Sequence, residues 1–244
     1  MKKLNFLKEK LVAHRGYHDI TIGIAENSLN SFRRAVKNNY LIELDVHLLK
    51  DKSLVVFHDD NLKRACGVDK EIDSCTYAEI KNLTLFNTSS KIPLLKEVFD
   101  EVKGRVPILI ETKGNNKYGE LEEILLREIK AYSGLTAVQS FNPKSIYWFK
   151  KNSNTYPRGI LIKSLSNGCL TKNVFKAVIY DMFLKTDFIS YDIRGLPNNY
   201  VDSKRKGKII LGWTIRSKKD YEASKPFCDN FICENILAYK ASIK

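Results

Sequence analysis

Short apolar runs that end in charged residues recur along this chain. The first run, Leu11 to Ala13, ends in His14-Arg-Gly16, and a later run, Pro107 to Ile110, ends in Glu111-Thr-Lys113. Continuous apolar runs of this length are typical of strands buried in a parallel sheet. The pattern therefore predicts buried strands that carry ionisable side chains to one edge of a sheet. Strands are predicted at Leu11–His14, from near Tyr40 to Val46, and at Pro107–Ile110, Thr136–Ser140, Arg158–Ile162, Phe188–Tyr191, Lys208–Trp213 and Asn230–Cys233.

Amphipathic helices are predicted after nearly all of these strands. The first begins at Asn27 or Ser28, both good N-cap residues, and places Leu29, Phe32 and Val36 on one face. Further helices are predicted at Thr76–Leu83, Leu94–Val102 and Tyr118–Tyr132, from Asn142-Pro143, over Val174–Met182, from Pro197 to Gly207, at Ser217–Ser224 and at the C-terminus.

Eight strands with intervening helices in about 240 residues are typical of a TIM (β/α)8 barrel, so we predict a single barrel domain over residues 1–244. A doubly wound open sheet is the alternative α/β fold. That fold would usually show a glycine-rich phosphate turn after the first strand, and His14-Arg-Gly16 is not such a turn.

A β-hairpin is predicted directly after the second strand. The turn at Lys50–Ser53 is too short to connect parallel strands, which need a dozen or more residues. Leu54–Phe57 is therefore expected to return antiparallel to the second strand. This return would bring His58 close to Glu43 and Asp45.

Glu43 and Asp45 lie two residues apart in the second strand, so both side chains point to one face. Two acidic groups inside an apolar strand are costly without a cation, although an exposed edge strand could also carry them. In a TIM barrel they would meet Glu111 at the C-terminal ends of neighbouring strands. Three carboxylates favour Mg²⁺ or Ca²⁺, and Mn²⁺ is also compatible with them.

Two cationic and two titratable side chains accompany the carboxylates. The planar guanidinium of Arg15 can donate two parallel hydrogen bonds, and the ammonium of Lys113 is a compact positive charge. Both side chains are therefore suited to binding a phosphate group. His14 and His58 titrate near neutral pH and could act as a base and an acid. This set is typical of a metal-assisted attack on a phosphate ester.

Trp213 has two interpretations: ordinary packing in the barrel, or an apolar wall for the alcohol part of the substrate. His18 and His47 are interpreted as structural.

The net charge of +13 arises from 41 Lys and Arg against 28 Asp and Glu residues. The lysines are spread along the chain, so a solvated surface is the simpler interpretation, and attraction of an anionic ligand or membrane is the alternative. The five cysteines include no C-x-x-C pair, which argues against a zinc knuckle or a redox motif. The apolar run Leu4–Leu7 is too short for a signal peptide, and no run approaches the length of a membrane span. We therefore predict a cytoplasmic protein.

The motifs together resemble those of the glycerophosphodiester phosphodiesterase family. The matching segments occur in the family's order and cover most of the chain. They are His14-Arg-Gly16, Glu26-Asn27-Ser28, Glu43-Leu-Asp-Val46, Val55-Val-Phe-His-Asp59, Leu62-Lys-Arg64, Ile92-Pro-Leu94, Glu111-Thr-Lys113, Ser140-Phe141 and Trp213-Thr214.

The resemblance implies a TIM barrel and assigns expected roles to particular residues. It implies one divalent metal at Glu43, Asp45 and Glu111, a catalytic pair at His14 and His58, and phosphate contacts from Arg15 and Lys113. Glu26, Phe141 and Trp213 are expected to line the substrate pocket.

The resemblance also implies metal-dependent hydrolysis of glycerophosphodiesters to an alcohol and sn-glycerol 3-phosphate. His14 would help a neighbouring substrate hydroxyl to attack phosphorus, and His58 would protonate the leaving alcohol. A lysophospholipase D-like activity on the same barrel is one alternative, and the basic surface would then help docking on an anionic membrane. A non-catalytic barrel that binds phospholipid or nucleic acid is the other, but a binder has no need of both histidines. We therefore expect no nucleic-acid partner.

Two segments depart from the family pattern. The family usually carries an Asn shortly after Trp-Thr, where this chain has Ile215-Arg216, and its last strand usually ends in Thr-Asp, where this chain has Cys233-Glu234-Asn235. We expect neither segment to touch the metal or the histidines. The departures should then concern the substrate head group and not the reaction.

Overall fold

The computed structural model describes residues 4–114, 118–164 and 183–236. The chain divides into two compact units. We call residues 15–136 the middle unit, and residues 1–14 together with 137–244 the terminal unit. The assignment of residues 1–244 to one domain stays a prediction.

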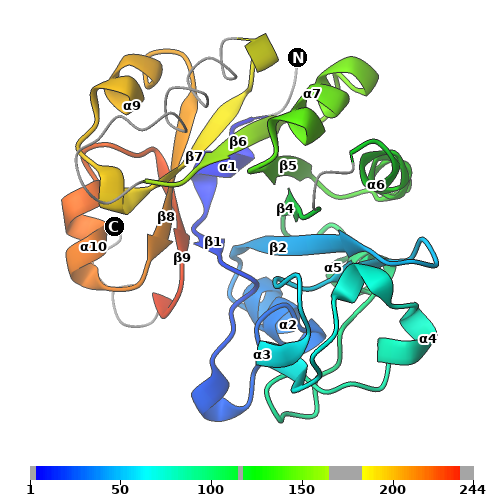
Figure 1. Ribbon diagram of the computed structural model, residues 1–244. Helices are drawn as coiled ribbons and strands as arrows, with labels where there is room; N and C mark the ends of the chain where they lie inside the picture. The colour runs from blue at the N-terminus through cyan, green and yellow to red at the C-terminus, as the bar shows by residue number, and fades with distance from the viewer. Residues whose placement is uncertain (1–3, 115–117, 165–182, 237–244) are drawn as a thin grey trace. The chain divides into compact units, whose positions relative to one another are not determined.

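The middle unit contains the predicted hairpin and the two strands that carry the predicted metal ligands. β2 pairs in parallel with β4 and antiparallel with β3, where Val46 lies opposite Val56. Its strands are β2 (Leu41–Leu48), β3 (Leu54–Val56) and β4 (Ile108–Thr112), and its helices are η1 (Ile20–Ile22), α2 (Leu29–Lys37), α3 (Lys63–Cys66), η2 (Ile72–Ser74), α4 (Tyr77–Ile80), α5 (Leu95–Val102) and α6 (Glu120–Ala131) (Figure 1).

Local sequence signals fix where α2 begins and which face it buries. The Ser28 hydroxyl accepts a hydrogen bond from the backbone N–H of Ser31 at 3.2 Å, which caps the first turn as predicted. Phe32 and Ala35 are fully buried, whereas Arg33 and Lys37 are exposed. The helix therefore packs through one apolar face and leaves its charged face in water.

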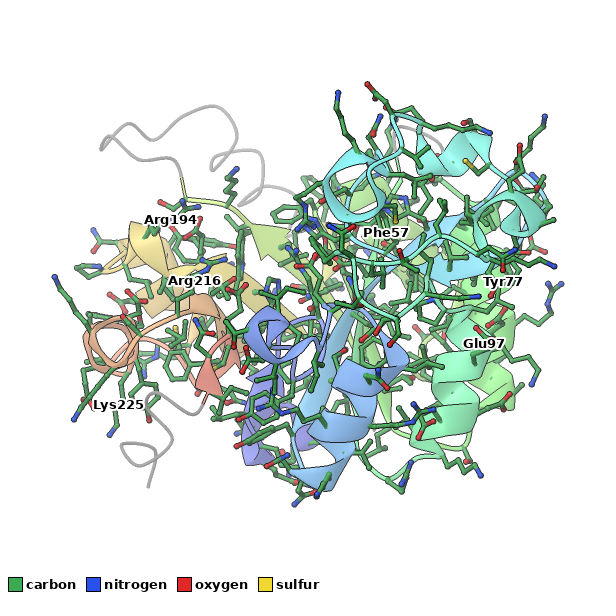
Figure 2. All side chains as sticks on the ribbon, turned by 90° about the horizontal axis from the view of Figure 1, so that it is seen from below. Phe57, Tyr77, Glu97, Arg194, Arg216 and Lys225 are labelled. Carbon is green, nitrogen blue, oxygen red and sulfur yellow. The ribbon has the colours of Figure 1, made fainter. Side chains whose placement is uncertain are left out.

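A small hydrophobic core fills the space beneath the hairpin return. Phe57, which directly precedes His58, is 2% exposed and lies inside this core (Figure 2). Its backbone N–H donates to the carbonyl oxygen of Asp45 at 3.0 Å. The buried members are Ala25, Leu49, Val55, Phe57, Leu62, Ala65, Ile72, Cys75, Ile80, Leu85 and Ile92. The core thus anchors the segment that leads into His58.

The terminal unit is an array of parallel strands in the order β5-β6-β7-β8-β9-β1. Its strands are β1 (Val12–Ala13), β5 (Thr136–Ser140), β6 (Arg158–Ile162), β7 (Phe188–Asp192), β8 (Ile209–Ile215) and β9 (Asn230–Cys233). Its helices are α1 (Phe6–Glu9), α7 (Pro143–Asn152), η3 (Ile193–Gly195), α9 (Asn199–Lys204) and α10 (Lys218–Ser224) (Figure 1). The predicted helix over Val174–Met182 and the helix expected at the C-terminus lie outside the described residues.

Some strands extend further than the sequence pattern indicates. For example, β4 continues through Glu111 to Thr112, and β8 continues through Trp213 to Ile215. Apolar periodicity marks only the part of a strand that meets other apolar groups, so charged or polar ends are missed. By contrast, the helix expected over Thr76–Leu83 is shorter in the structure, where it spans Tyr77–Ile80.

The described residues contain no helix that is long and apolar enough to cross a membrane. Cys66, Cys75, Cys228 and Cys233 are free thiols. The cytoplasmic location stays a prediction.

The buried face of α2 supports a stability prediction. Phe32→Ala should lower the free energy of unfolding by about 3–5 kcal/mol, because it removes a fully buried ring and leaves a cavity. Urea unfolding followed by circular dichroism measures this loss. Phe183→Ala is the matched control, since that ring is 70% exposed and its removal should change little. Equal losses in the two variants would contradict the packing of α2.

Candidate active site

Three buried carboxylates from two neighbouring strands converge in the middle unit. Glu43 and Asp45 on β2 are each 1% exposed, and Glu111 on β4 is 6% exposed. Asp45 and Glu111 are paired positions in the parallel register, so the strands themselves place these side chains together. One oxygen from each of the three lies within 4.8 Å of the others. This burial rules out the exposed edge strand that was the alternative interpretation of Glu43 and Asp45.

The loop after β1 wraps around the carboxylates and brings Arg15 to them. The backbone N–H of Arg15 donates to the Glu43 carboxylate at 3.0 Å, and the N–H of Gly16 donates to the Glu43 carbonyl oxygen at 3.1 Å. The Arg15 guanidinium donates to Glu26 at 2.8 Å, and its Nε lies 3.6 Å from Asp45. Arg15 and Asn27 both have left-handed backbone conformations, with φ of 53° and 52°, which is common at functional sites.

The path of the loop after β1 requires a glycine at Gly16. Its φ is 79°, and a Cβ there would lie 2.3 Å from the Ser31 hydroxyl and 2.9 Å from the Phe32 ring. A larger residue would therefore displace either α2 or the Arg15 backbone.

Lys113, which directly follows β4, also binds the carboxylates. Its Nζ donates to Glu111 at 2.7 Å and lies 3.1 Å from Asp45. Its backbone N–H donates to the carbonyl oxygen of Val46, which continues the pairing of β2 and β4. Although burial lowers the pKa of the Lys113 amine, the charges of Asp45 and Glu111 raise it overall, so the side chain stays cationic.

The carboxylates respond unequally to this environment. Burial, followed by the charges of Asp45 and Glu111, raises the pKa of Glu43 well above its usual value. Burial also acts to raise the pKa of Asp45, but the charges of Lys113 and Arg15 hold it below its usual range. Burial raises the pKa of Glu111, against the lowering effect of Lys113. Negative charge is therefore under-compensated at Glu43 and Glu111.

The donor set fits a hard divalent cation. The three carboxylates carry three negative charges and Arg15 and Lys113 carry two positive ones, which leaves one excess negative charge among these five groups. The Asn27 amide adds a second observation, because it donates to Asp45 at 2.9 Å while its buried carbonyl oxygen has no hydrogen-bond partner. Carboxylate and amide oxygens are the ligands that Mg²⁺ and Ca²⁺ take in proteins. Glu43, Asp45 and Glu111 could thus hold such an ion.

His58 is oriented by a neighbouring carboxylate. Its Nδ1 lies 2.6 Å from the Asp59 carboxylate, and Arg64 binds the same carboxylate through two nitrogens, at 2.5 and 3.1 Å. Arg64 also donates to Glu26 at 2.6 Å, which links this group to Arg15. Burial acts to raise the pKa of Asp59, but hydrogen bonds from His58 and Arg64 hold it far below its usual range. A charged Asp59 would hold a proton on Nδ1 of His58 and leave Nε2 for proton transfer.

His14 belongs to the terminal unit and has a carboxylate partner there, which corrects the sequence prediction. Its Nδ1 lies 2.7 Å from Glu234, and Arg216 donates to both oxygens of Glu234, at 2.9 and 3.2 Å. The two segments that depart from the family pattern were expected to leave the histidines untouched, and this expectation is wrong. Sequence spacing could not reveal the contact, because 220 residues separate Glu234 from His14.

The predicted aromatic pocket residues lie together in the terminal unit. The rings of Phe141 and Trp213 are edge to face, with centroids 5.6 Å apart. Phe141 is 46% exposed, and the Trp213 indole nitrogen is buried without a hydrogen-bond partner. An exposed ring braced by a second one is suited to an apolar contact with a ligand. His47, which was interpreted as structural, is fully buried with its Nδ1 at 3.0 Å from Asp73.

Comparisons with known proteins show which proteins this chain is similar to. The model of the glycerophosphoryl diester phosphodiesterase family matches residues 14–234. A glycerophosphodiester phosphodiesterase of Caldanaerobacter subterraneus subsp. tengcongensis is 30% identical over 228 residues, which cover 88% of this chain and 89% of that protein. Lysophospholipase D GDPD1 of Homo sapiens is 38% identical over 128 residues, which cover 47% of this chain and 39% of that protein.

The chain belongs to the glycerophosphoryl diester phosphodiesterase family.

Solved structures confirm the fold class. The structure of an Oleispira antarctica phosphodiesterase in complex with the product sn-glycerol-3-phosphate has a TM-score of 0.81 and 20% identity, and the match covers 96% of both chains. This likeness, shared with other structures of the family, confirms the predicted (β/α)8 barrel and the extra strand of the hairpin. The predicted enzyme class, a phosphoric diester hydrolase of this family, is likewise confirmed. The roles of individual residues stay predictions.

Three residues of this family member contribute to the site in ways that sequence reasoning missed. Asn27 was considered as a helix cap and matched to a family segment, yet it binds Asp45, and Asp59 and Arg64 were matched to family segments without a role. Asp59 carried a usable signal, since it directly follows His58. No sequence signal pointed to Asn27 or Arg64, because their contacts depend on how two loops fold over the strand ends.

The pKa of Glu43 gives a prediction about stability. A raised pKa means that the charged Glu43 destabilises the folded state at neutral pH, and that this loss disappears as the pH falls below about 4. In excess EDTA at neutral pH, Glu43→Gln should therefore raise the melting temperature by about 2–5 °C, because the amide oxygen can still accept from Arg15. The gain should shrink towards zero near pH 4.

Divalent ions provide the second half of this experiment. Mg²⁺ or Ca²⁺ should raise the melting temperature of the wild type and have little effect on Glu43→Gln. Glu123→Gln is the matched control, since Glu123 is an exposed residue of α6 in the same unit. A variant that is less stable than the wild type in EDTA would contradict the charge imbalance.

Proposed function

We propose that this protein hydrolyses glycerophosphodiesters to an alcohol and sn-glycerol 3-phosphate in a metal-dependent reaction, with His14 and His58 as its acid and base. The observation that carries the proposal is the cluster of Glu43, Asp45 and Glu111 within 4.8 Å, with Lys113 and Arg15 paired to it. Membership of the family and the match to a product-bound phosphodiesterase support the same substrate class.

The charge of the site suits a phosphodiester. A divalent cation held by Glu43, Asp45 and Glu111 would act as a Lewis acid on a phosphoryl oxygen. It would also convert the excess of one negative charge among the five groups into one positive charge, which attracts a singly charged phosphodiester.

Arg15 and Lys113 are the proposed phosphate ligands. Both are held near Asp45 in fixed positions, so little reorganisation is needed when a phosphoryl group arrives. Their hydrogen bonds strengthen as charge develops on the phosphoryl oxygens, and this stabilises the transition state more than the ground state. Glu26 holds both Arg15 and Arg64, so we assign it a positioning role at the edge of the pocket.

The two histidines are proposed to move the protons. His14 accepts the proton of the substrate hydroxyl that attacks phosphorus, and His58 donates a proton to the leaving alcohol oxygen, so that a cyclic phosphate of glycerol remains. Water then opens the cyclic phosphate to give sn-glycerol 3-phosphate. Each ring is held by a carboxylate at Nδ1, which leaves Nε2 as the nitrogen that exchanges the proton. Phe141 and Trp213 are proposed to contact the alcohol part of the substrate.

The first test is release of glycerol 3-phosphate from glycerophosphocholine and glycerophosphoethanolamine, with Mg²⁺, with Ca²⁺ and with excess EDTA. His58→Gln should lower kcat by about 10²–10⁴-fold, because the leaving alcohol loses its general acid. His18→Gln is the matched control, since His18 lies outside the predicted site, and its kcat should be unchanged. Release that continues in EDTA and in His58→Gln would refute the mechanism.

A lysophospholipase D-like activity is the second candidate function. It is favoured by the similarity to lysophospholipase D GDPD1 and by an exposed apolar loop. Ile20 and Ile22 are 51% and 60% exposed in η1, on the loop whose ends are Arg15 and Glu26. An apolar tip on a loop anchored in the site could contact the acyl chain or the surface of an aggregated lysophospholipid.

Measuring the hydrolysis of two substrates separates the two activities. If the second candidate is correct, choline release from micellar lysophosphatidylcholine should fall about 3–10-fold in the double variant Ile20→Ser, Ile22→Ser, because the two exposed apolar side chains leave the lipid contact. Hydrolysis of glycerophosphocholine should not change. Val68→Ser serves as a control for loss of an exposed apolar residue elsewhere in the middle unit. No choline release by the wild type would exclude this candidate.

A further inference from the structure

Glu234 and Arg216 occupy the same register level as His14 in the terminal unit. Ala13 of β1 pairs with Cys233 of β9, and Cys233 pairs with Ile215 of β8. His14, Glu234 and Arg216 are the residues that follow these three positions. The backbone continues the register, since the N–H of His14 donates to Cys233 at 3.0 Å and the N–H of Glu234 donates to Ile215 at 2.8 Å. The strand ends thus place three ionisable side chains in one row.

The side chains of this row bind one another in a fixed order. Nδ1 of His14 lies 2.7 Å from Oε1 of Glu234, and the Arg216 guanidinium donates to both Glu234 oxygens. The His14 and Glu234 side chains are 13% and 18% exposed, whereas the Arg216 side chain is 59% exposed and lies at the surface (Figure 2). The contact between histidine and carboxylate is therefore shielded from water, and the arginine fixes the carboxylate from outside.

His58 has the same arrangement in the middle unit. There Asp59 binds Nδ1 and Arg64 binds Asp59 through two nitrogens. Each histidine thus has one carboxylate at Nδ1, and one arginine donates to that carboxylate. At His14, however, the two supporting residues come from the segments in which this chain departs from the family pattern.

We propose that Glu234 is a positioning residue for His14, and that Arg216 holds Glu234 in place. The inference rests on the proposed function, which gives His14 a catalytic role. A carboxylate at Nδ1 accepts a hydrogen bond from that nitrogen, so the neutral ring carries its proton on Nδ1 and its lone pair on Nε2. The ring is then ready to take a proton from the attacking hydroxyl, in the orientation that the strand ends set.

Kinetics of Glu234 variants test the consequence for the reaction. Glu234→Gln should lower kcat for glycerophosphocholine by about 10–100-fold with KM within about twofold, because the amide can donate to Nδ1 and favour the wrong tautomer. Glu234→Asp should recover part of kcat, since it restores the carboxylate. Arg216→Gln should lower kcat by about 2–10-fold. Glu222→Gln, an exposed change in α10 of the same unit, should leave both constants unchanged.

The tautomer of His14 is a second readout that does not need activity. The protein contains four histidines, so ¹⁵N-histidine labelling gives few signals, and the His14 signal is assigned by its loss in His14→Gln. In the neutral ring, the wild type should show the proton on Nδ1. Glu234→Gln should move the proton to Nε2, and Arg216→Gln should leave a mixture.

The two readouts separate failure of this inference from failure of the proposed function. Wild-type kcat in a folded Glu234→Gln variant, or a lower kcat with an unchanged tautomer, would overturn the positioning role. A rise in KM alone would also overturn it, because it would indicate a role in substrate binding. A wild type that hydrolyses no glycerophosphodiester would count against the proposed function, and the tautomer change would still establish the contact.

Discussion

The burial of three carboxylates on two paired strands is the constraint on which the rest of the middle unit depends. Asp45 and Glu111 are opposite each other in the register of β2 and β4, and Glu43 is two residues away on the same face. Buried negative charges of this kind are expensive unless cations and hydrogen bonds compensate them. Lys113 and the backbone of the loop at Arg15 supply that compensation. The hydrophobic strands thus supply rigidity, and the loops supply the opposite charge.

The compensation is incomplete, because two cations are paired with three carboxylates. Burial, followed by the charges of Asp45 and Glu111, keeps the pKa of Glu43 well above its usual value. A fully balanced cluster would gain stability but would have little affinity for a divalent ion. The protein therefore keeps a locally unfavourable charge distribution, which the surrounding apolar strands can hold because they are close-packed.

Both histidines have the same supporting chemistry by different structural routes. At His58 the carboxylate is the next residue in the chain, and the hydrophobic core around Phe57 holds the segment. At His14 the carboxylate comes from the end of β9, and the arginine from the residue after β8. A local contact and a long-range contact thus reach one geometry, in which a carboxylate binds Nδ1 of the histidine.

The sequence by itself determined the strands, the caps, the hairpin and the identity of the charged residues at the strand ends. These features depend on side-chain periodicity, N-cap preference and loop length, which act over a few residues. Ser28 caps its helix as predicted, and Asn142 and Ser217 cap the helices that were predicted to begin at these residues. The tertiary structure decided which charges meet. Asn27 on Asp45, Arg64 on Glu26 and Glu234 on His14 are contacts between segments that are distant in the chain. Local propensity has no information about such pairs, because strand register and loop path bring them together only when the chain has folded.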